Sequence, residues 1–152
     1  MSALRLNHTS FHKMKVHAMV SYPEECCGFL FGISDRSMKT VCDILEMRNR
    51  KEEERTRRYL ITADDYRLAE QRAAQAGVDL LGLYHSHPNQ PAEPSQFDLD
   101  HALPAWSYII LSVDNAVATN VSSWILRDDR SSFSEEQVEV VDGEFVHRCA
   151  EP

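Results

Sequence analysis

Several features of membrane, secreted and multidomain proteins are missing from this chain of 152 residues. No run approaches the roughly 18 consecutive apolar residues that a membrane-spanning helix needs. The first residues carry His8, His12 and Lys13 where a secretory signal would place an apolar core, so we expect a cytoplasmic protein. No internal repeat and no Gly- or Ser-rich linker divides the chain, so we expect a single domain over residues 1–152.

Basic residues are also in short supply. Sixteen Lys and Arg residues stand against 24 Asp and Glu residues, which gives a formal net charge of −8. Nucleic-acid binding depends on phosphate neutralisation by clustered Lys and Arg. The charge balance therefore speaks against a nucleic-acid partner, and the missing apolar run speaks against a membrane partner.

The four cysteines, Cys26, Cys27, Cys42 and Cys149, include no Cys-x-x-Cys pair of the kind used in metal or redox sites. Two disulfides are one interpretation. However, Cys26 and Cys27 are adjacent, which makes them poor mutual partners, and both lie in an apolar run. We therefore expect reduced cysteines, most of them in the core.

Hydrophobic spacing and turn signals predict a mixed α/β fold. A first helix is expected over residues 10–21, with Ser10 as N-cap and an end before Pro23. A second is expected over residues 62–76, where Thr62 and Asp65 form a capping box. A third, short helix is expected to begin at Ser95. Strands are expected over residues 27–33, 38–46, 78–84, 107–113, 121–126 and 138–146, the last split by a hairpin signal at Asp142-Gly143. Because several strands connect by hairpins, we expect a mixed, partly antiparallel central sheet flanked by helices.

Between these elements lies a stretch, residues 50–58, in which eight of nine residues are charged, with both signs. This composition is typical of a solvated connection. Residues 59–61 after it could form a short extended segment.

The chemistry is concentrated in residues 84–98. In a strand, residues two apart face the same side, so His85 and His87 present their imidazoles side by side where an apolar strand ends. Three prolines stiffen the following loop, which lowers the entropy lost when it is ordered. Ser95 as N-cap with Asp98 at the third helical position then returns a carboxylate to the two histidines.

Two neutral imidazoles and one carboxylate suit zinc, and three protein ligands leave a fourth position for water. The ion can lower the pKa of that water to about 7, which provides a nucleophile at neutral pH. Taken singly, His85 and His87 could be a chance pair, and Ser95 with Asp98 could be only a helix cap. Together they predict one zinc site with catalytic capability.

The pattern His85-Ser86-His87-Pro88, followed by Ser95 and Asp98, resembles the signature of the JAMM (MPN-plus) metalloprotease family. That family also places a glutamate upstream in a Glu-x-x-Gly context. This chain has Glu25 in such a context, directly before the first expected strand. The lack of insertions resembles the compact, stand-alone prokaryotic subgroup, and the family fold has a cytidine-deaminase-like architecture.

The resemblance implies a role for each matching residue. His85, His87 and Asp98 would bind zinc, Glu25 would take a proton from the zinc-bound water and pass it to the leaving amine, and Ser95 would donate a hydrogen bond to the developing oxyanion. Glu24 is the rival base, but its spacing to the glycine is one residue too long, so we interpret it as a surface carboxylate.

Other zinc signatures are absent. The chain has neither the His-Glu-x-x-His helix of many metalloproteases nor the Cys-x-x-Cys half of the nucleobase deaminase pattern. We therefore expect surface or supporting positions for the remaining histidines, which are His8, His12, His17, His101 and His147.

From the resemblance we expect a zinc-dependent peptidase that trims the C-terminal tail of a ubiquitin-like sulfur-carrier protein and exposes its diglycine end. An extended tail could pair with a strand edge, and residues 59–61 are our candidate for one wall of that groove. Two alternatives stay open. One is an isopeptidase that removes ubiquitin-like modifiers from lysines, and the other is a non-catalytic MPN-type scaffold.

Overall fold

The computed structural model describes residues 3–36 and 38–142. These residues form seven strands and three helices, which confirms the expected mixed α/β class. Along the chain the elements are β1 (Ala3–Asn7), α1 (His8–Ser21), β2 (Cys27–Asp35), β3 (Met38–Met47), α2 (Ala63–Ala76), β4 (Asp79–Pro88), α3 (Gln96–Asp100), β5 (Ser107–Asp114), β6 (Val117–Leu126) and β7 (Phe133–Val141).

The strands close into a barrel in the order β1-β3-β2-β4-β5-β6-β7, because β1 pairs with both β3 and β7. These two pairings and that of β4 with β5 are parallel, and the others are antiparallel. The expected mixture of strand directions is thus confirmed, whereas the expected central sheet flanked by helices is wrong, because the strands close into a barrel. Strand β1 was not expected from the sequence, and its pairing with both β3 and β7 removes the two edges of the sheet.

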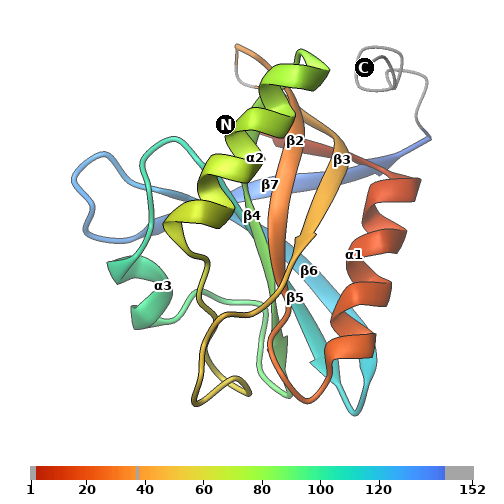
Figure 1. Ribbon diagram of the computed structural model, residues 1–152, viewed down its shortest axis with the longest axis vertical. Helices are drawn as coiled ribbons and strands as arrows, with labels where there is room; N and C mark the ends of the chain where they lie inside the picture. Colours follow the sequence, from red (N-terminus) through yellow and green to blue (C-terminus); the bar gives the residue numbers. More distant parts are fainter. Residues whose placement is uncertain (1–2, 37, 143–152) are drawn as a thin grey trace.

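Helix α1 lies along one side of the barrel (Figure 1) and buries Ser10, Met14 and Ala18. The last two belong to a core cluster that includes Leu6 from β1 and Leu111 from β5. Asn7 is the N-cap of α1, because its side chain accepts a hydrogen bond from the backbone N–H of Ser10 at 2.8 Å. The expectation that Ser10 caps this helix is therefore wrong, and the helix begins two residues earlier.

Helix α2 packs against the barrel at β4 and shows the expected caps. Thr62 and Asp65 form the predicted capping box, and Gly77 ends the helix in the left-handed conformation with φ of 68°. Ala69 and Ala73 of α2 pack into a second core cluster, which also contains the β4 residue Leu83. Side chains of β4 thus alternate between the two clusters.

Strand β4 continues through His85 and His87 to Pro88, four residues beyond the predicted end. Both histidines are therefore on regular strand geometry between two neighbours, β2 and β5. The strand predicted over residues 138–146 starts earlier, as β7, and pairs with β6. Its expected turn at Asp142-Gly143 reaches residues outside those described.

Residues 59–61 belong to no strand or helix, which is compatible with the short extended segment expected there. The charged loop before them is largely exposed, as predicted. In Figure 1 this loop, drawn in yellow, connects β3 to α2 and lies near the C-terminal end of β4.

Cys26 and Cys27 are free and buried, as expected. Cys42 is disulfide-bonded, so the expectation of four reduced cysteines is wrong. Cys149 lies outside the described residues.

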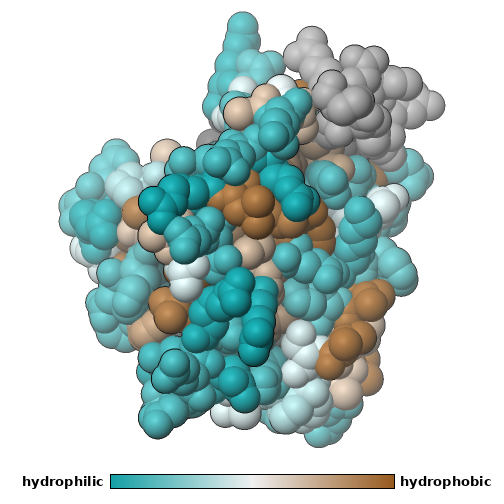
Figure 2. Space-filling model, in the orientation of Figure 1, coloured by the Kyte–Doolittle hydropathy of each residue, from teal (hydrophilic) through white to brown (hydrophobic). Residues whose placement is uncertain are grey.

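The outer surface is largely hydrophilic on the face seen in Figure 2, with one apolar patch near its centre and another on the lower part of α1. Val16 and Val20 are the exposed large apolar residues of that helix. Among the residues described, no helix combines the length and apolar character needed to cross a bilayer.

Candidate metal centre

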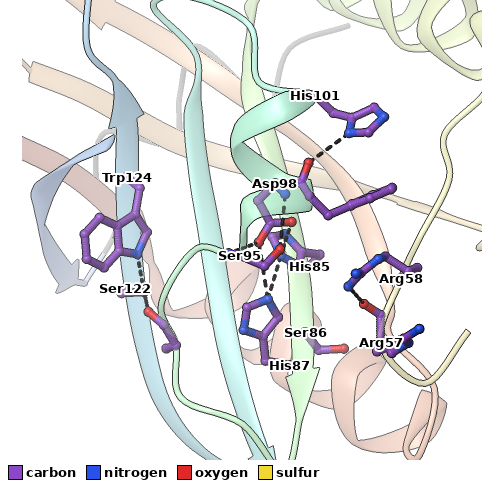
Figure 3. Close-up of polar contacts among 12 residues, drawn as sticks. Arg57, Arg58, His85, Ser86, His87, Ser95, Asp98, His101, Ser122 and Trp124 are labelled. Atoms are coloured by element: carbon purple, nitrogen blue, oxygen red, sulfur yellow. Dashed lines mark hydrogen bonds and ion pairs between the residues drawn. The ribbon is translucent and has the colours of Figure 1, made fainter. Parts of the chain in front are cut away.

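Three side chains converge at the end of β4 (Figure 3). The Nε2 atoms of His85 and His87 lie 3.1 Å apart. The Asp98 carboxylate reaches both of them, with Oδ1 at 3.3 Å from His85 Nε2 and Oδ2 at 3.5 Å from His87 Nε2. All three residues are buried. The structure therefore brings together the two histidines and the aspartate on which the sequence analysis depended.

This donor set fits a metal ion. Ligand atoms about 2.0–2.1 Å from a tetrahedral zinc lie about 3.3 Å from one another, which is close to the three separations seen here. His87 Nδ1 lies 2.9 Å from the Pro91 carbonyl oxygen. A carbonyl only accepts hydrogen bonds, so Nδ1 carries the proton and Nε2 keeps a free lone pair for the metal.

The electrostatics of the pair also suit a cation. Burial tends to raise the pKa of Asp98, but the neighbouring His85 and His87 and a hydrogen bond from the Ser95 backbone outweigh it and hold this pKa far below its usual range. Burial likewise tends to lower the pKa of His85, yet Asp98 outweighs it and raises that pKa. The site thus holds a carboxylate that stays ionised although it is buried.

Glu25 is the other carboxylate near the histidines, and its ligand atom and theirs all lie within 4.8 Å of one another. Asp98 is the third ligand expected from the sequence, and one of its oxygens lies within 3.5 Å of each Nε2 atom. The pKa of Glu25 is raised by burial, with partial opposition from His85 and His87. A buried carboxyl group with a raised pKa, close to the metal position, is suited to accept and release a proton.

Ser95 and Asp98 form a capping box at the start of α3. The Asp98 N–H donates to Ser95 Oγ at 3.1 Å, and the Ser95 N–H donates to Asp98 Oδ2 at 2.8 Å. This arrangement aims the carboxylate at the histidines. Because Ser95 Oγ accepts in that bond, its own hydrogen remains free to donate elsewhere.

Ser86 joins the glutamate segment to the histidine strand. Its Oγ accepts a hydrogen bond from the Cys26 N–H at 2.8 Å, and its own N–H donates to the Cys26 carbonyl at 3.2 Å. The adjoining register pairs Cys27 with His85. Glu25 is therefore placed beside the histidines although about 60 residues separate them. The alternation of a strand, which turns Ser86 away from the histidines, is a signal that could have identified it in the sequence.

The loop after β4 is tied to the barrel by two serines. Ser112 Oγ donates to the Gln90 carbonyl at 2.8 Å, and Ser122 Oγ donates to the Ala92 carbonyl. Trp124 Nε1 in turn donates to Ser122 Oγ at 2.7 Å. These anchors fix the Pro91 carbonyl on which His87 depends. Nothing in the local sequence marks the two serines, which lie on β5 and β6.

The remaining candidates are separate from the centre. Glu24 pairs with Arg55 at 3.0 Å and is half-buried, as expected of a surface carboxylate. His8, His12 and His101 are exposed, and His147 lies outside the described residues. His17 is half-buried, and its Nδ1 is 2.7 Å from the hydroxyl of Tyr84.

Two clefts adjoin the proposed catalytic side chains. One, of about 230 Å³, touches Ser95 and is walled by Leu99, Trp124 and Phe133. The other, of 370 Å³, touches Glu25 and is lined by charged residues that include Arg48 and Arg55. A cleft thus adjoins each of the two side chains, Ser95 and Glu25.

Comparisons with known proteins find a family and relatives that this chain resembles. A family model described as prokaryotic homologs of the JAB domain matches residues 9–127. The desampylase of Haloferax volcanii is 33% identical over 99 residues, which are 64% of this chain and 69% of that protein.

Solved structures are similar in fold. A Salinibacter ruber protein is 40% identical, with a TM-score of 0.71 and coverage of 92% of this chain and 93% of that one. The Desulfitobacterium hafniense protein DSY2949 has a TM-score of 0.83 at 24% identity, with coverage of 95% and 97%. The JAB1/MPN domain protein AF2198 from Archaeoglobus fulgidus has a TM-score of 0.57 at 16% identity, with coverage of 93% and 100%.

Proposed function

Because this chain belongs to the family of prokaryotic JAB-domain proteins, we propose that it is a zinc-dependent peptidase. Its substrate would be the amide bond at the C-terminal tail of a ubiquitin-like sulfur-carrier protein, and its product the exposed diglycine end. The observation that carries the proposal is the convergence of two imidazole nitrogens and an ionised carboxylate beside a second carboxyl group with a raised pKa.

His85, His87 and Asp98 would hold the zinc ion, which would supply polarisation of the scissile carbonyl and acidification of a water molecule. Glu25 takes a proton from the attacking water and transfers it to the leaving amine as the carbon–nitrogen bond breaks. Ser95 donates its free hydroxyl hydrogen to the oxyanion that develops on the carbonyl. The products are a carboxylate on the tail and a free amine, so the atoms of water are accounted for.

The cleft beside Ser95 is our candidate for binding the substrate tail. Its walls of Leu99, Trp124 and Phe133 offer apolar contact directly next to the oxyanion donor. Residues 59–61, the segment expected to form one wall of the tail-binding groove, are not part of a strand and offer no strand edge for pairing. The tail would therefore depend on side-chain contacts in this cleft.

An isopeptidase is the second candidate, and one finding favours it. The relative from Haloferax volcanii is a desampylase, and its name describes removal of a Samp modifier. The same side chains would perform this reaction, with a lysine ε-amine as the leaving group. A non-catalytic scaffold is less well supported, because the residue types expected for activity are present at all five positions and lie close together.

Zinc content and cleavage test the proposal together. Purified protein should contain about one zinc per chain, and Glu25→Gln should retain that zinc but lose cleavage, since an amide cannot take up the proton. The His85→Ala variant should lose zinc. Normal zinc in His85→Ala would refute the ligand assignment, and full activity in Glu25→Gln would refute the base.

Two substrates separate the candidates. A carrier with a peptide extension after its diglycine reports peptidase activity, and a carrier–lysine conjugate reports isopeptidase activity. Faster cleavage of the extended carrier supports trimming, whereas cleavage of the conjugate alone supports the isopeptidase.

A further inference from the structure

The loop formed by residues 49–60 has no role in the mechanism above, yet it contacts His85, the backbone of Glu25 and the helix that carries Asp98. It carries most of the charged residues between β3 and α2, and those at its tip are exposed. Its two ends are held together by a hydrogen bond from the Arg50 N–H to the Leu60 carbonyl at 3.0 Å. The loop is therefore closed at its base, next to the site.

The first contact involves His85. A metal-bound histidine is normally oriented by a hydrogen bond on its second ring nitrogen, as His87 is by Pro91. His85 Nδ1 is buried and has no such partner among the described residues. The ring of Tyr59 stacks on it instead, with centroids 4.7 Å apart and an angle of 27° between the planes. A flat ring against the imidazole restricts its rotation by contact alone.

The second contact involves Glu25. Its N–H donates to the Arg55 carbonyl at 2.7 Å, and its carbonyl accepts from Asn49 Nδ2 at 3.2 Å. Asn49 Nδ2 also donates to the Arg58 carbonyl at 3.0 Å, and its Oδ1 accepts from the Leu60 N–H at 3.2 Å. The half-buried amide group of Asn49 thus joins the backbone of Glu25 to the backbone on both sides of Tyr59.

The third contact lies beside Asp98. The guanidinium of Arg58 sits over the ring of Phe97, 4.9 Å from its centroid. Figure 3 shows Arg58 on the side of the centre opposite Trp124. The loop therefore also packs against the helix that supplies the carboxylate.

We propose that the loop of residues 49–60 is a positioning device for the metal centre, in which Tyr59 orients His85 and Asn49 holds Glu25 to the same loop. The inference rests on the proposed function, because it takes His85 as a ligand and Glu25 as the base. The contacts that act are a ring face and backbone hydrogen bonds. The charges at the loop tip are not required.

Tyr59 is tested by zinc affinity measured without substrate. Tyr59→Leu should weaken zinc binding by about 10- to 100-fold, the loss typical when a group that orients a ligand is removed. Tyr59→Phe should bind within about threefold of the original protein, since it keeps the ring. Tyr59→Met retains bulk without a flat ring and guards against a folding defect in the leucine variant; it should lose affinity as well. Binding by both ringless variants within about threefold of the original protein would overturn the role of Tyr59.

Asn49 is tested by catalysis at saturating zinc. Asn49→Asp keeps the acceptor for Leu60 but removes both donated hydrogen bonds, so kcat should fall about tenfold while KM changes little. The matched control is Glu52→Gln combined with Glu53→Gln, which removes two exposed charges from the same loop and should leave zinc affinity and kcat within about twofold. Equal effects of the Asn49 variant and this control would overturn the role of Asn49.

These outcomes are distinguishable from failure of the proposed function. If the original protein binds zinc but cleaves neither carrier substrate, the function is wrong, and the Tyr59 series still decides how His85 is oriented. If the original protein binds no zinc, both proposals fall.

Discussion

The substitution Gly28→Ala tests how the glutamate segment is packed. Gly28 is paired with Tyr84 in the register of β2 and β4. A Cβ atom added at Gly28 would lie 2.5 Å from both Cζ and the hydroxyl oxygen of Tyr84. Comfortable contact needs about 3.5 Å, so the ring would have to move by about 1 Å. Tyr84 is completely buried, so its ring cannot move outward into solvent and would have to displace neighbouring core atoms.

The cost can be estimated from these contacts. Inserting a methyl group into a packed core costs about 1–3 kcal/mol. Moving the ring also disturbs the 2.7 Å hydrogen bond between the Tyr84 hydroxyl and His17 Nδ1, whose net contribution is about 1 kcal/mol. We therefore expect Gly28→Ala to lower the free energy of unfolding by about 2–4 kcal/mol. For a chain of this length, each kcal/mol corresponds to about 2–4 °C in Tm.

Urea unfolding measures the change directly, with a lower midpoint and an unchanged m-value. In a Tyr84→Leu background the same substitution should cost less than about 1 kcal/mol, because the clashing ring is gone. Gly77→Ala is the matched control. It has open space around its Cβ position and a φ of 68°, so it should cost about 1 kcal/mol in either background. A cost below about 0.5 kcal/mol for Gly28→Ala, or equal costs in both backgrounds, would refute the reasoning.

Two further substitutions address the site and its cleft. Ser86→Ala removes the acceptor of the buried Cys26 N–H, so the free energy of unfolding should fall by about 1–3 kcal/mol. The value of kcat should drop because Glu25 shifts, whereas zinc affinity should be retained. Denaturation and zinc titration check this, and an unchanged stability would contradict it. Trp124→Ala should raise KM for the carrier about tenfold and leave kcat nearly unchanged, because the lost contact is made equally in the ground and transition states. Trp124→Phe should keep most of the affinity for the carrier. A loss confined to kcat would show that Trp124 does not bind the tail.

Local features were predictable where the determining residues are neighbours in the chain. The capping box of Thr62 and Asp65 and the left-handed end at Gly77 follow from contacts within one or two helical turns. The two-residue alternation of a strand likewise places His85 and His87 on one face. The error at the start of α1 has a local cause, since Asn7 and Ser10 are both good caps and β1 determines where the chain turns.

Other features depend on residues that are far apart in sequence. The barrel closes because β1 fits between β3 and β7, and no periodicity within five residues reveals those two partners. Likewise the disulfide at Cys42 depends on which residue folding brings to it.

The metal centre shows the same division. From the sequence alone came the residue types and the expectation that two imidazoles and a carboxylate would meet. The tertiary structure decided that Asp98 reaches both Nε2 atoms, that Ser86 carries the Glu25 segment alongside, and that Tyr59 stacks on His85. The reason is physical: alternation and capping are short-range properties of the backbone, whereas register between strands and the path of a loop are set by packing across the whole core.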